Sequence, residues 1–141
     1  MEQDIPSLAE CGGFMYLHSE IKTKDGNTYP MIGIIQGTCE YKGRLIRFGY
    51  INVEEKHHLF LPETFPIIKG HEFHYFDSSN NGDDCLSSKP LLGTTDNEKV
   101  KDWYSGFVTD KHWWGFAHLY YPSNPEFAKH FVNVCRKVAK S

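Results

Sequence analysis

The chain has 141 residues, of which 40% are hydrophobic and 15% aromatic, and its formal net charge is −3. This composition is typical of one globular domain with a real core, and it excludes a wholly disordered chain. Lysines and arginines are scattered along the sequence and predict no basic face, which argues against nucleic-acid binding, and no apolar run is long enough to span a bilayer.

The N-terminal segment predicts a strand, a tight turn and a helix. Residues 5–9 form a short apolar run. Cys11 stands two positions after this run and directly before two glycines. Phe14, Leu17 and Ile21 then recur at helical spacing. Cys11 is therefore expected in the turn that joins the strand to the helix.

Such a turn holds its central residue in strained backbone geometry and thrusts the side chain outward. It closes only if the residues two before and two after are small, as Ala9 and Gly13 are. The free N–H groups and positive end of the helix would lower the thiol pKa and offer donors for an oxyanion. This pattern favours Cys11 as a nucleophile; the alternative is a buried structural cysteine beside a glycine turn.

The rest of the chain predicts an α/β fold in which strands dominate. Asp25-Gly26-Asn27 is a turn signal, and prolines and charges mark a loop over residues 56–66. Residues 77–97 are rich in Ser, Asn, Gly and Asp and predict a long exposed excursion. Apolar, alternating or aromatic-rich runs predict strands over residues 31–35, 44–53, 67–76, 103–108 and 113–119.

A helix is expected at the C-terminal end. Asn124 can cap it, with Pro125 at its first position and Glu126 near its positive end. One apolar stripe, which is typical of core packing, follows at Phe127, Phe131, Val134 and Val138.

Residues 71–75 combine histidines with a glutamate, but the period of a strand argues against a metal site. His71 and His74 would point to opposite faces, whereas Glu72 and His74 would share one. These two could bond each other or a bound amide, or could only fix the sheet, and the sequence leaves both readings open. The other cysteines, Cys39, Cys85 and Cys135, have no ligand spacing, and no disulfide framework or metal site is predicted.

Residues 9–17, Ala-Glu-Cys-Gly-Gly-Phe-Met-Tyr-Leu, resemble the glutamine-amidotransferase domain of cobyrinic acid a,c-diamide synthases, in the cobyrinate/cobyric acid group of class I amidotransferases. Further motifs carry the resemblance along the chain at Asp25-Gly26, Tyr29-Pro30-Met31 with Gly33, Phe48-Gly49-Tyr50, residues 70–75, and His118-Leu119 before Ser123-Asn124-Pro125. The resemblance implies an α/β, flavodoxin-like three-layer fold that is incomplete at its N-terminus. Residues 1–141 would then be the C-terminal portion of an amidotransferase domain, without the ATP-binding domain.

The resemblance also implies roles for individual residues. Cys11 would be the nucleophile, and His118 the general base and acid. Gly12 and Gly13 would support the oxyanion, and Glu72 and His74 the substrate site. Two residues after His118, where many class I amidotransferases carry an acid, stands Tyr120. Glu10 receives no role, because strand alternation points it away from the Cys11 side chain.

The implied function is release of ammonia from glutamine to amidate carboxylates of a corrinoid or related tetrapyrrole in cobalamin biosynthesis. ATP and Mg²⁺ are expected on a separate N-terminal domain, since the chain holds no Gly-x-x-x-x-Gly-Lys-Ser/Thr segment. The expected partners are that domain or a second copy of the chain, and the expected compartment is the cytoplasm. Alternatives are a nickel-sirohydrochlorin a,c-diamide synthase portion, or a non-catalytic remnant or interaction module. A truncated chain and one half of a split enzyme also remain open.

Overall fold

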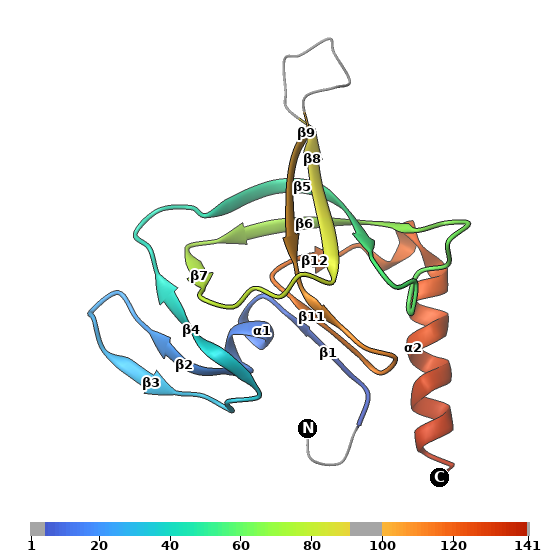
Figure 1. Ribbon diagram of the computed structural model, residues 1–141, viewed down its shortest axis with the longest axis horizontal. Coiled ribbons are helices and arrows are strands. Elements are labelled where there is room, and N and C mark those ends of the chain that lie inside the picture. The colour runs from blue at the N-terminus through green and yellow to red at the C-terminus, as the bar shows by residue number, and fades with distance from the viewer. Residues whose placement is uncertain (1–4, 91–99, 141) are drawn as a thin grey trace.

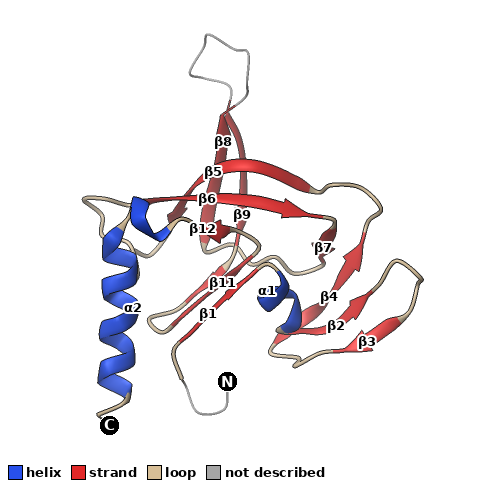
Figure 2. Cartoon of the chain, turned by 180° about the vertical axis from the view of Figure 1, so that it is seen from behind, coloured by secondary structure: helices blue, strands red, loops and turns tan. Residues whose placement is uncertain are grey.

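The computed structural model describes residues 5–90 and 100–140 (Figures 1 and 2). Its helices are α1 (Gly12–Tyr16), the 3-10 turn η1 (Tyr121–Ser123) and α2 (Pro125–Val138). Its strands are β1 (Ser7–Glu10), β2 (His18–Lys22), β3 (Thr28–Pro30), β4 (Ile35–Tyr41), β5 (Arg47–Glu55), β6 (Ile67–His74), β7 (Phe76–Ser78), β8 (Cys85–Pro90), β9 (Val100–Ser105), β10 (Phe107–Val108), β11 (His112–Gly115) and β12 (His118–Leu119). The chain is of the α/β class, mostly sheet with few helices.

The described strands form three sheets. The five-stranded sheet has the order β12-β6-β5-β8-β9, the four-stranded sheet β3-β2-β4-β7, and the three-stranded sheet β1-β11-β10. Figure 1 shows the long β5–β6 pair crossing the upper half, the four-stranded sheet at the left and α2 at the right. Within the described part of the chain, neither α-helix has the length and hydropathy that a membrane span requires.

The parallel pair β1 and β11 is central to the arrangement. It runs in register from Ser7 opposite His112 to Glu10 opposite Gly115, so both strands end at the same level. All residues of β11 are buried, as expected of a parallel strand that is covered on both faces. Successive side chains of a strand point to opposite faces, so Trp113 and Trp114 enter two different cores.

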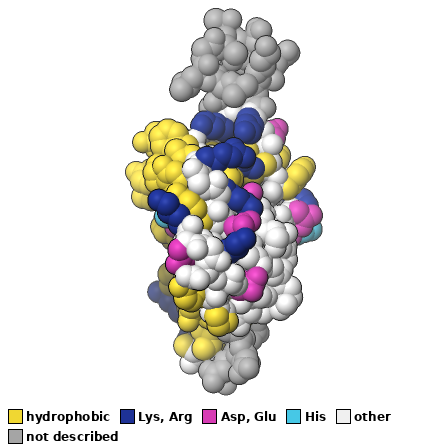
Figure 3. All heavy atoms as spheres, turned by 90° about the vertical axis from the view of Figure 1, so that its left-hand side faces the viewer, with side chains coloured by type: hydrophobic (Ala, Val, Ile, Leu, Met, Phe, Trp, Pro, Cys, Tyr) yellow, Lys and Arg dark blue, Asp and Glu magenta, His cyan; other side chains and the backbone are white. Residues whose placement is uncertain are grey.

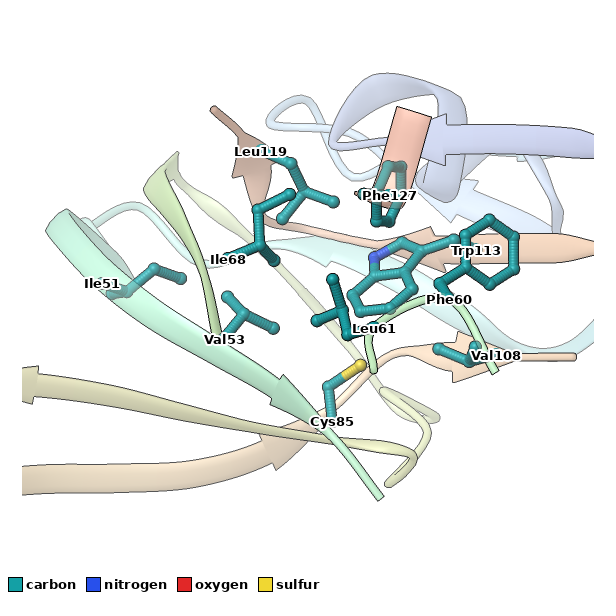
Figure 4. Packing of buried hydrophobic residues seen from close by; sticks show 10 residues of the cluster. All are labelled: Ile51, Val53, Phe60, Leu61, Ile68, Cys85, Val108, Trp113, Leu119 and Phe127. Atoms are coloured by element: carbon teal, nitrogen blue, oxygen red, sulfur yellow. The ribbon is translucent and has the colours of Figure 1, made fainter. Parts of the chain in front are cut away.

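The two hydrophobic cores lie on either side of β11. The larger one is built mainly by the five-stranded sheet, the loop after β5, β11 and α2 (Figure 4), from Ile51, Val53, Phe60, Leu61, Ile68, Cys85, Val108, Trp113, Leu119 and Phe127. The smaller one surrounds α1 and contains Ala9, Phe14, Leu17, Ile35, Cys39, Trp114 and Phe116. The buried ring of Phe127 has its centroid 5.1 Å from those of both Phe60 and Trp113, so α2 is anchored in the larger core.

The C-terminal helix confirms the sequence prediction. The Asn124 side chain accepts a hydrogen bond from the Glu126 N–H at 3.3 Å, and Pro125 is the first residue of α2. Phe127 and Val134 are buried along the predicted stripe. The same Asn124 side chain donates to the carbonyls of residues 65 and 67, which ties the start of α2 to the start of β6.

The helix after Cys11 is shorter than predicted. It ends at Tyr16, and Ile21 lies in β2 instead. β2 pairs with β3 along one edge and with β4 along the other. Sheet pairing on both edges satisfies the backbone of this segment, and it outweighs the helical spacing of Phe14, Leu17 and Ile21.

Two further expectations are wrong in part. Only Ile35 of residues 31–35 is in a strand, and Gly33 just before it has a φ of 77°, which interrupts an extended chain. Residues 77–97 are not one exposed excursion, because Cys85–Pro90 form β8 in the five-stranded sheet. Small polar residues can pack inside a sheet, as the fully buried Ser87 does. Residues 91–97 lie outside the described part.

Candidate active site

Cys11 lies in the turn between β1 and α1 with φ 47° and ψ −105°. A positive φ is uncommon for a residue other than glycine, and such strain costs about 1–3 kcal/mol. The Cys11 N–H donates to the Gly115 carbonyl at 2.9 Å, and its own carbonyl accepts from the Met15 N–H at 2.9 Å. These bonds fix the turn between the end of β11 and α1. The strained strand-to-helix turn that the sequence predicts is confirmed.

Ala9 and Gly13 face each other across this turn. A Cβ added at Gly13 would stand 3.7 Å from the Ala9 Cβ, which is ordinary van der Waals contact. An alanine therefore fits at position 13. A side chain larger than alanine at position 9 or 13 would clash with the residue at the other position. The turn around Cys11 therefore requires small residues at positions 9 and 13, but position 13 does not require glycine.

The environment of the Cys11 thiol opposes its ionisation. Burial raises its pKa most, and the negative charges of Glu72 and Glu10 raise it further, while a hydrogen bond from the Gly12 backbone lowers it. The net shift is upward, so the predicted lowering of the thiol pKa is wrong. α1 has only five residues, and its small dipole does not offset burial beside two carboxylates. A base is needed to produce the thiolate at neutral pH.

His118 follows the neighbouring strand. β1 and β11 end side by side at Glu10 and Gly115, and Cys11 and His118 both come after these ends. This is the expected placement at the carboxyl ends of adjacent strands. His118 itself pairs with His71 of β6, and its side chain is half exposed. Within the described residues, no hydrogen bond joins the thiol to His118, and their catalytic roles stay predictions.

Glu10 connects the two segments. Its Oε2 lies 4.0 Å from the Nδ1 of His118. Its Oε1 accepts a hydrogen bond from the Tyr121 hydroxyl at 2.5 Å and a longer one from the Leu119 N–H at 3.4 Å. Burial and this bond raise the pKa of Tyr121, so the phenol keeps its proton and remains a donor. Tyr121 therefore holds the Glu10 carboxylate beside the imidazole ring of His118.

The sequence interpretation missed Glu10. Strand alternation was expected to point it away from the Cys11 side chain, but Cys11 has left the strand, and its positive φ redirects the chain. Glu10 keeps its strand direction and faces the segment after β11. The sequence signal for a role of Glu10 was its position directly before the cysteine. Strand alternation argued against such a role.

Glu72 and His74 lie on the same face of β6, as the strand period predicts, and both are buried. Their Oε2 and Nε2 atoms lie 3.0 Å apart, and the Nδ1 of His74 lies 2.7 Å from the Phe76 carbonyl. A carbonyl only accepts, so Nδ1 carries a proton. The contact between Nε2 and Glu72 then needs one further proton, on either partner. The structure thus shows the first of the two possible partners, because the two side chains bond each other; a role toward substrate stays a prediction.

This pair lies beneath the segment that carries His118. The ring of His74 stacks on Phe116 with centroids 4.0 Å apart and planes 8° from parallel, and Phe116 stands two residues before His118. Glu72 is also close enough to Cys11 for its charge to influence the thiol. The inner face of β6 thus supports both candidate catalytic segments.

The outer face of the same sheet carries a second set of groups. His71 and His118 lie there with ring centroids 6.1 Å apart. They border an apolar cavity of about 470 Å³ together with Tyr50 and Tyr120. His118 therefore stands between Glu10 and this cavity, where a bound molecule could reach its ring.

Known proteins match this chain over most of its length. Residues 1–124 match the family model described as the CobB/CobQ-like glutamine amidotransferase domain. Proteins named cobyrinate a,c-diamide synthase are 28% identical over 137 residues in Salmonella typhimurium, 33% over 124 residues in Listeria innocua and 35% over 131 residues in Limosilactobacillus reuteri. These alignments cover 97%, 88% and 91% of this chain, respectively.

The coverage of the relatives is much smaller. The same alignments span 29%, 26% and 28% of their lengths. This chain therefore corresponds to less than a third of each of these proteins, and most of their length has no counterpart in it.

Proposed function

Because the chain belongs to the CobB/CobQ-like glutamine amidotransferase family, we propose that it is the glutamine-hydrolysing portion of a cobyrinate a,c-diamide synthase. The observation that carries this proposal is the strained Cys11 turn at the end of β1, beside the parallel strand whose continuation holds His118. Open α/β sheets place their reacting groups at such strand ends. The relatives named above support the substrate class.

In the proposed reaction the Cys11 sulfur attacks the side-chain amide carbon of glutamine. His118 takes the thiol proton and returns it to the departing ammonia, so the C–N bond breaks and a C–S thioester bond remains. The raised pKa of the thiol makes this proton transfer necessary, because little thiolate exists at neutral pH. Glu10 stabilises the imidazolium that forms in between.

The second half of the reaction consumes water. His118 removes a proton from water, the hydroxide attacks the thioester carbon, and glutamate leaves as the thiol of Cys11 is restored. Each attack produces an oxyanion, which backbone N–H groups stabilise. We propose the Gly12 N–H as one donor, with Gly13 keeping the turn open. Glu72 and His74 are proposed to hold the floor of this site in place.

The ammonia is proposed to amidate carboxylates of cobyrinate or a closely related tetrapyrrole. A carboxylate must first be activated by phosphorylation, and the nucleotide and Mg²⁺ are proposed to bind outside this chain. The relatives reported above carry the cobyrinate name, so the nickel-sirohydrochlorin alternative is not favoured.

Covalent labelling tests the proposal. A diazo-ketone analogue of glutamine should modify Cys11 ahead of the other partly exposed thiol, Cys135, and excess glutamine should slow the modification. Replacing His118 with Asn should slow it by about 10²-fold, in line with the loss of a general base. Mass spectrometry of digested protein identifies the modified cysteine.

Cys11→Ser is the matched control and should leave only slow, glutamine-insensitive labelling at Cys135. Equal labelling of Cys11 and Cys135, with no protection by glutamine, would remove the hydrolase proposal.

A further inference from the structure

A second cavity, of about 230 Å³, lies near the β8–β9 end of the five-stranded sheet. Three cationic side chains line it, those of Arg47, Lys89 and Lys101. Trp103 contributes an aromatic surface, and Phe48, whose ring packs against His71 and Phe73, also borders the cavity. This combination of positive charge and flat apolar surface differs from the apolar cavity beside His118.

The guanidinium of Arg47 is held in a fixed position. Its carbon lies 4.7 Å from the centre of the Trp103 ring, and its Nη1 donates to the Ile46 carbonyl at 3.2 Å. Stacking on an aromatic face leaves the edge of a guanidinium available for an oxygen ligand. Arg47 is thus ordered before any ligand arrives.

Lys89 is also placed by the sheet. Its ammonium donates to the Phe48 carbonyl and lies over Gly49, where a Cβ would come within 2.9 Å of it. On β9, Lys101 is the direct cross-strand partner of Lys89. Like charges directly opposite on paired strands repel each other and destabilise the fold. An anion bound between Lys89 and Lys101 would reduce this repulsion.

Within the described residues, no carboxylate makes an ion pair with any of these three cations. Glu72 also lines the cavity, but its carboxylate is bonded to His74. Strand pairing brings these three cations together from distant positions in the sequence. Figure 3 shows Lys and Arg side chains gathered on the half of the molecule where β8 and β9 lie, beside hydrophobic ones.

We propose that this cavity binds a carboxylate arm of a flat, apolar ligand that carries several carboxylates. The cations recognise the carboxylate oxygens, and Trp103, on whose ring Arg47 stacks, borders the bound arm. The volume fits one arm and leaves the body of a large ligand outside. This proposal rests on the proposed function, because the acceptor there is a tetrapyrrole polycarboxylate.

Glu72 links the cavity to the candidate active site. Glu72 borders the cavity, and its charge reaches the thiol of Cys11. A smaller cavity of about 30 Å³ shares Arg47, Glu72 and Trp103 with it and extends to His74 and Phe116. An acceptor anchored here would lie on the same face of β6 as the pair that supports the Cys11 site.

Calorimetric titration of the chain with benzenehexacarboxylate tests this. This probe is a flat ring edged with carboxylates. It should bind saturably and quench the fluorescence of Trp103, with weaker binding at higher salt. Arg47→Gln and Lys89→Gln should each weaken binding at least tenfold. Lys24→Gln and Arg136→Gln remove the same charge from exposed positions elsewhere and should leave it unchanged.

Equal weakening by the control variants, or a fluorescence change that persists in Trp103→Phe, would overturn the site. Displacement of the probe by equimolar inorganic pyrophosphate would identify a phosphate site and overturn the carboxylate assignment. Lys101→Gln, at an exposed position, provides the test if Arg47→Gln fails to fold. Diazo-ketone labelling of Cys11 in the same variants separates the proposals, because its loss with intact probe binding would contradict only the hydrolase.

Discussion

The Cys11 thiol is held in its protonated form by its neighbours. Burial and the charges of Glu72 and Glu10 raise its pKa, and the Gly12 backbone bond only partly compensates. The strained φ of 47° sets the direction of the Cys11 side chain, but it does not promote ionisation of the thiol. Cys11 is therefore positioned for attack while its activation depends on proton removal.

Removing the charge of Glu10 separates two effects. Glu10→Gln takes a negative charge away from the thiolate, so the pKa of Cys11 falls and its thiolate fraction at neutral pH rises. Alkylation by iodoacetamide, followed against pH, should show its midpoint shifted to lower pH. Glutamine-directed labelling should instead slow down, because the imidazolium of His118 loses its carboxylate. Glu63→Gln, an exposed change, should alter neither rate, and a midpoint that rises in Glu10→Gln would contradict the electrostatic account.

Local sequence was sufficient for part of the site. The Cys11 turn follows from the small residues Ala9 and Gly13, and the shared face of Glu72 and His74 follows from the strand period; both were predicted and are present. The Glu10–His118 contact joins residues far apart in the chain, and no local period encodes it. The direction of the Cys11 pKa was missed for the same reason, because burial and the charge of Glu72 are properties of the folded chain.

At the scale of elements, strand pairing determined where the helix after Cys11 ends, which the hydrophobic periodicity of the sequence did not. Phe14 and Leu17 are buried as a helical stripe requires, yet the chain turns into β2 one residue after Leu17. A segment with partners on both edges forms a strand whatever its intrinsic preference. Similarly, the polar composition around β8 concealed a strand whose partners, β5 and β9, lie elsewhere in the sequence.

The loop after β5 depends on one buried carboxylate. Glu55 is almost fully buried and accepts hydrogen bonds from the backbone N–H groups of Leu59, Phe60 and Leu61. Glu55→Ala leaves these donors without a partner, and we expect it to lower the free energy of unfolding by about 3 kcal/mol. Urea unfolding measures the change. Glu63→Ala in the same loop should cost under about 0.5 kcal/mol, and equal costs would show that Glu55 does not hold the loop.

At the scale of the whole molecule, β11 couples the two cores. Trp113 belongs to the larger core and Trp114 to the smaller, on opposite faces of one short strand. Neither core can open by moving β11 without disturbing the other, so the described fold should unfold as one unit. Two buried thiols report on this directly, because Cys85 lies in the larger core and Cys39 in the smaller.

Pulsed thiol labelling across a urea series at pH 8 tests this coupling. Burial raises the pKa of Cys39 to about 12 and also raises that of Cys85, so both should stay protonated and unreactive in the folded chain. Cys11 and Cys135 are partly exposed and should react first, with Cys135 the reference for unhindered access. Cys39 and Cys85 should then lose protection at the same urea concentration, because unfolding of either core removes β11 from the other. Mass spectrometry resolves the four sites, and Cys39 reacting well below the midpoint for Cys85 would show that the smaller core opens independently.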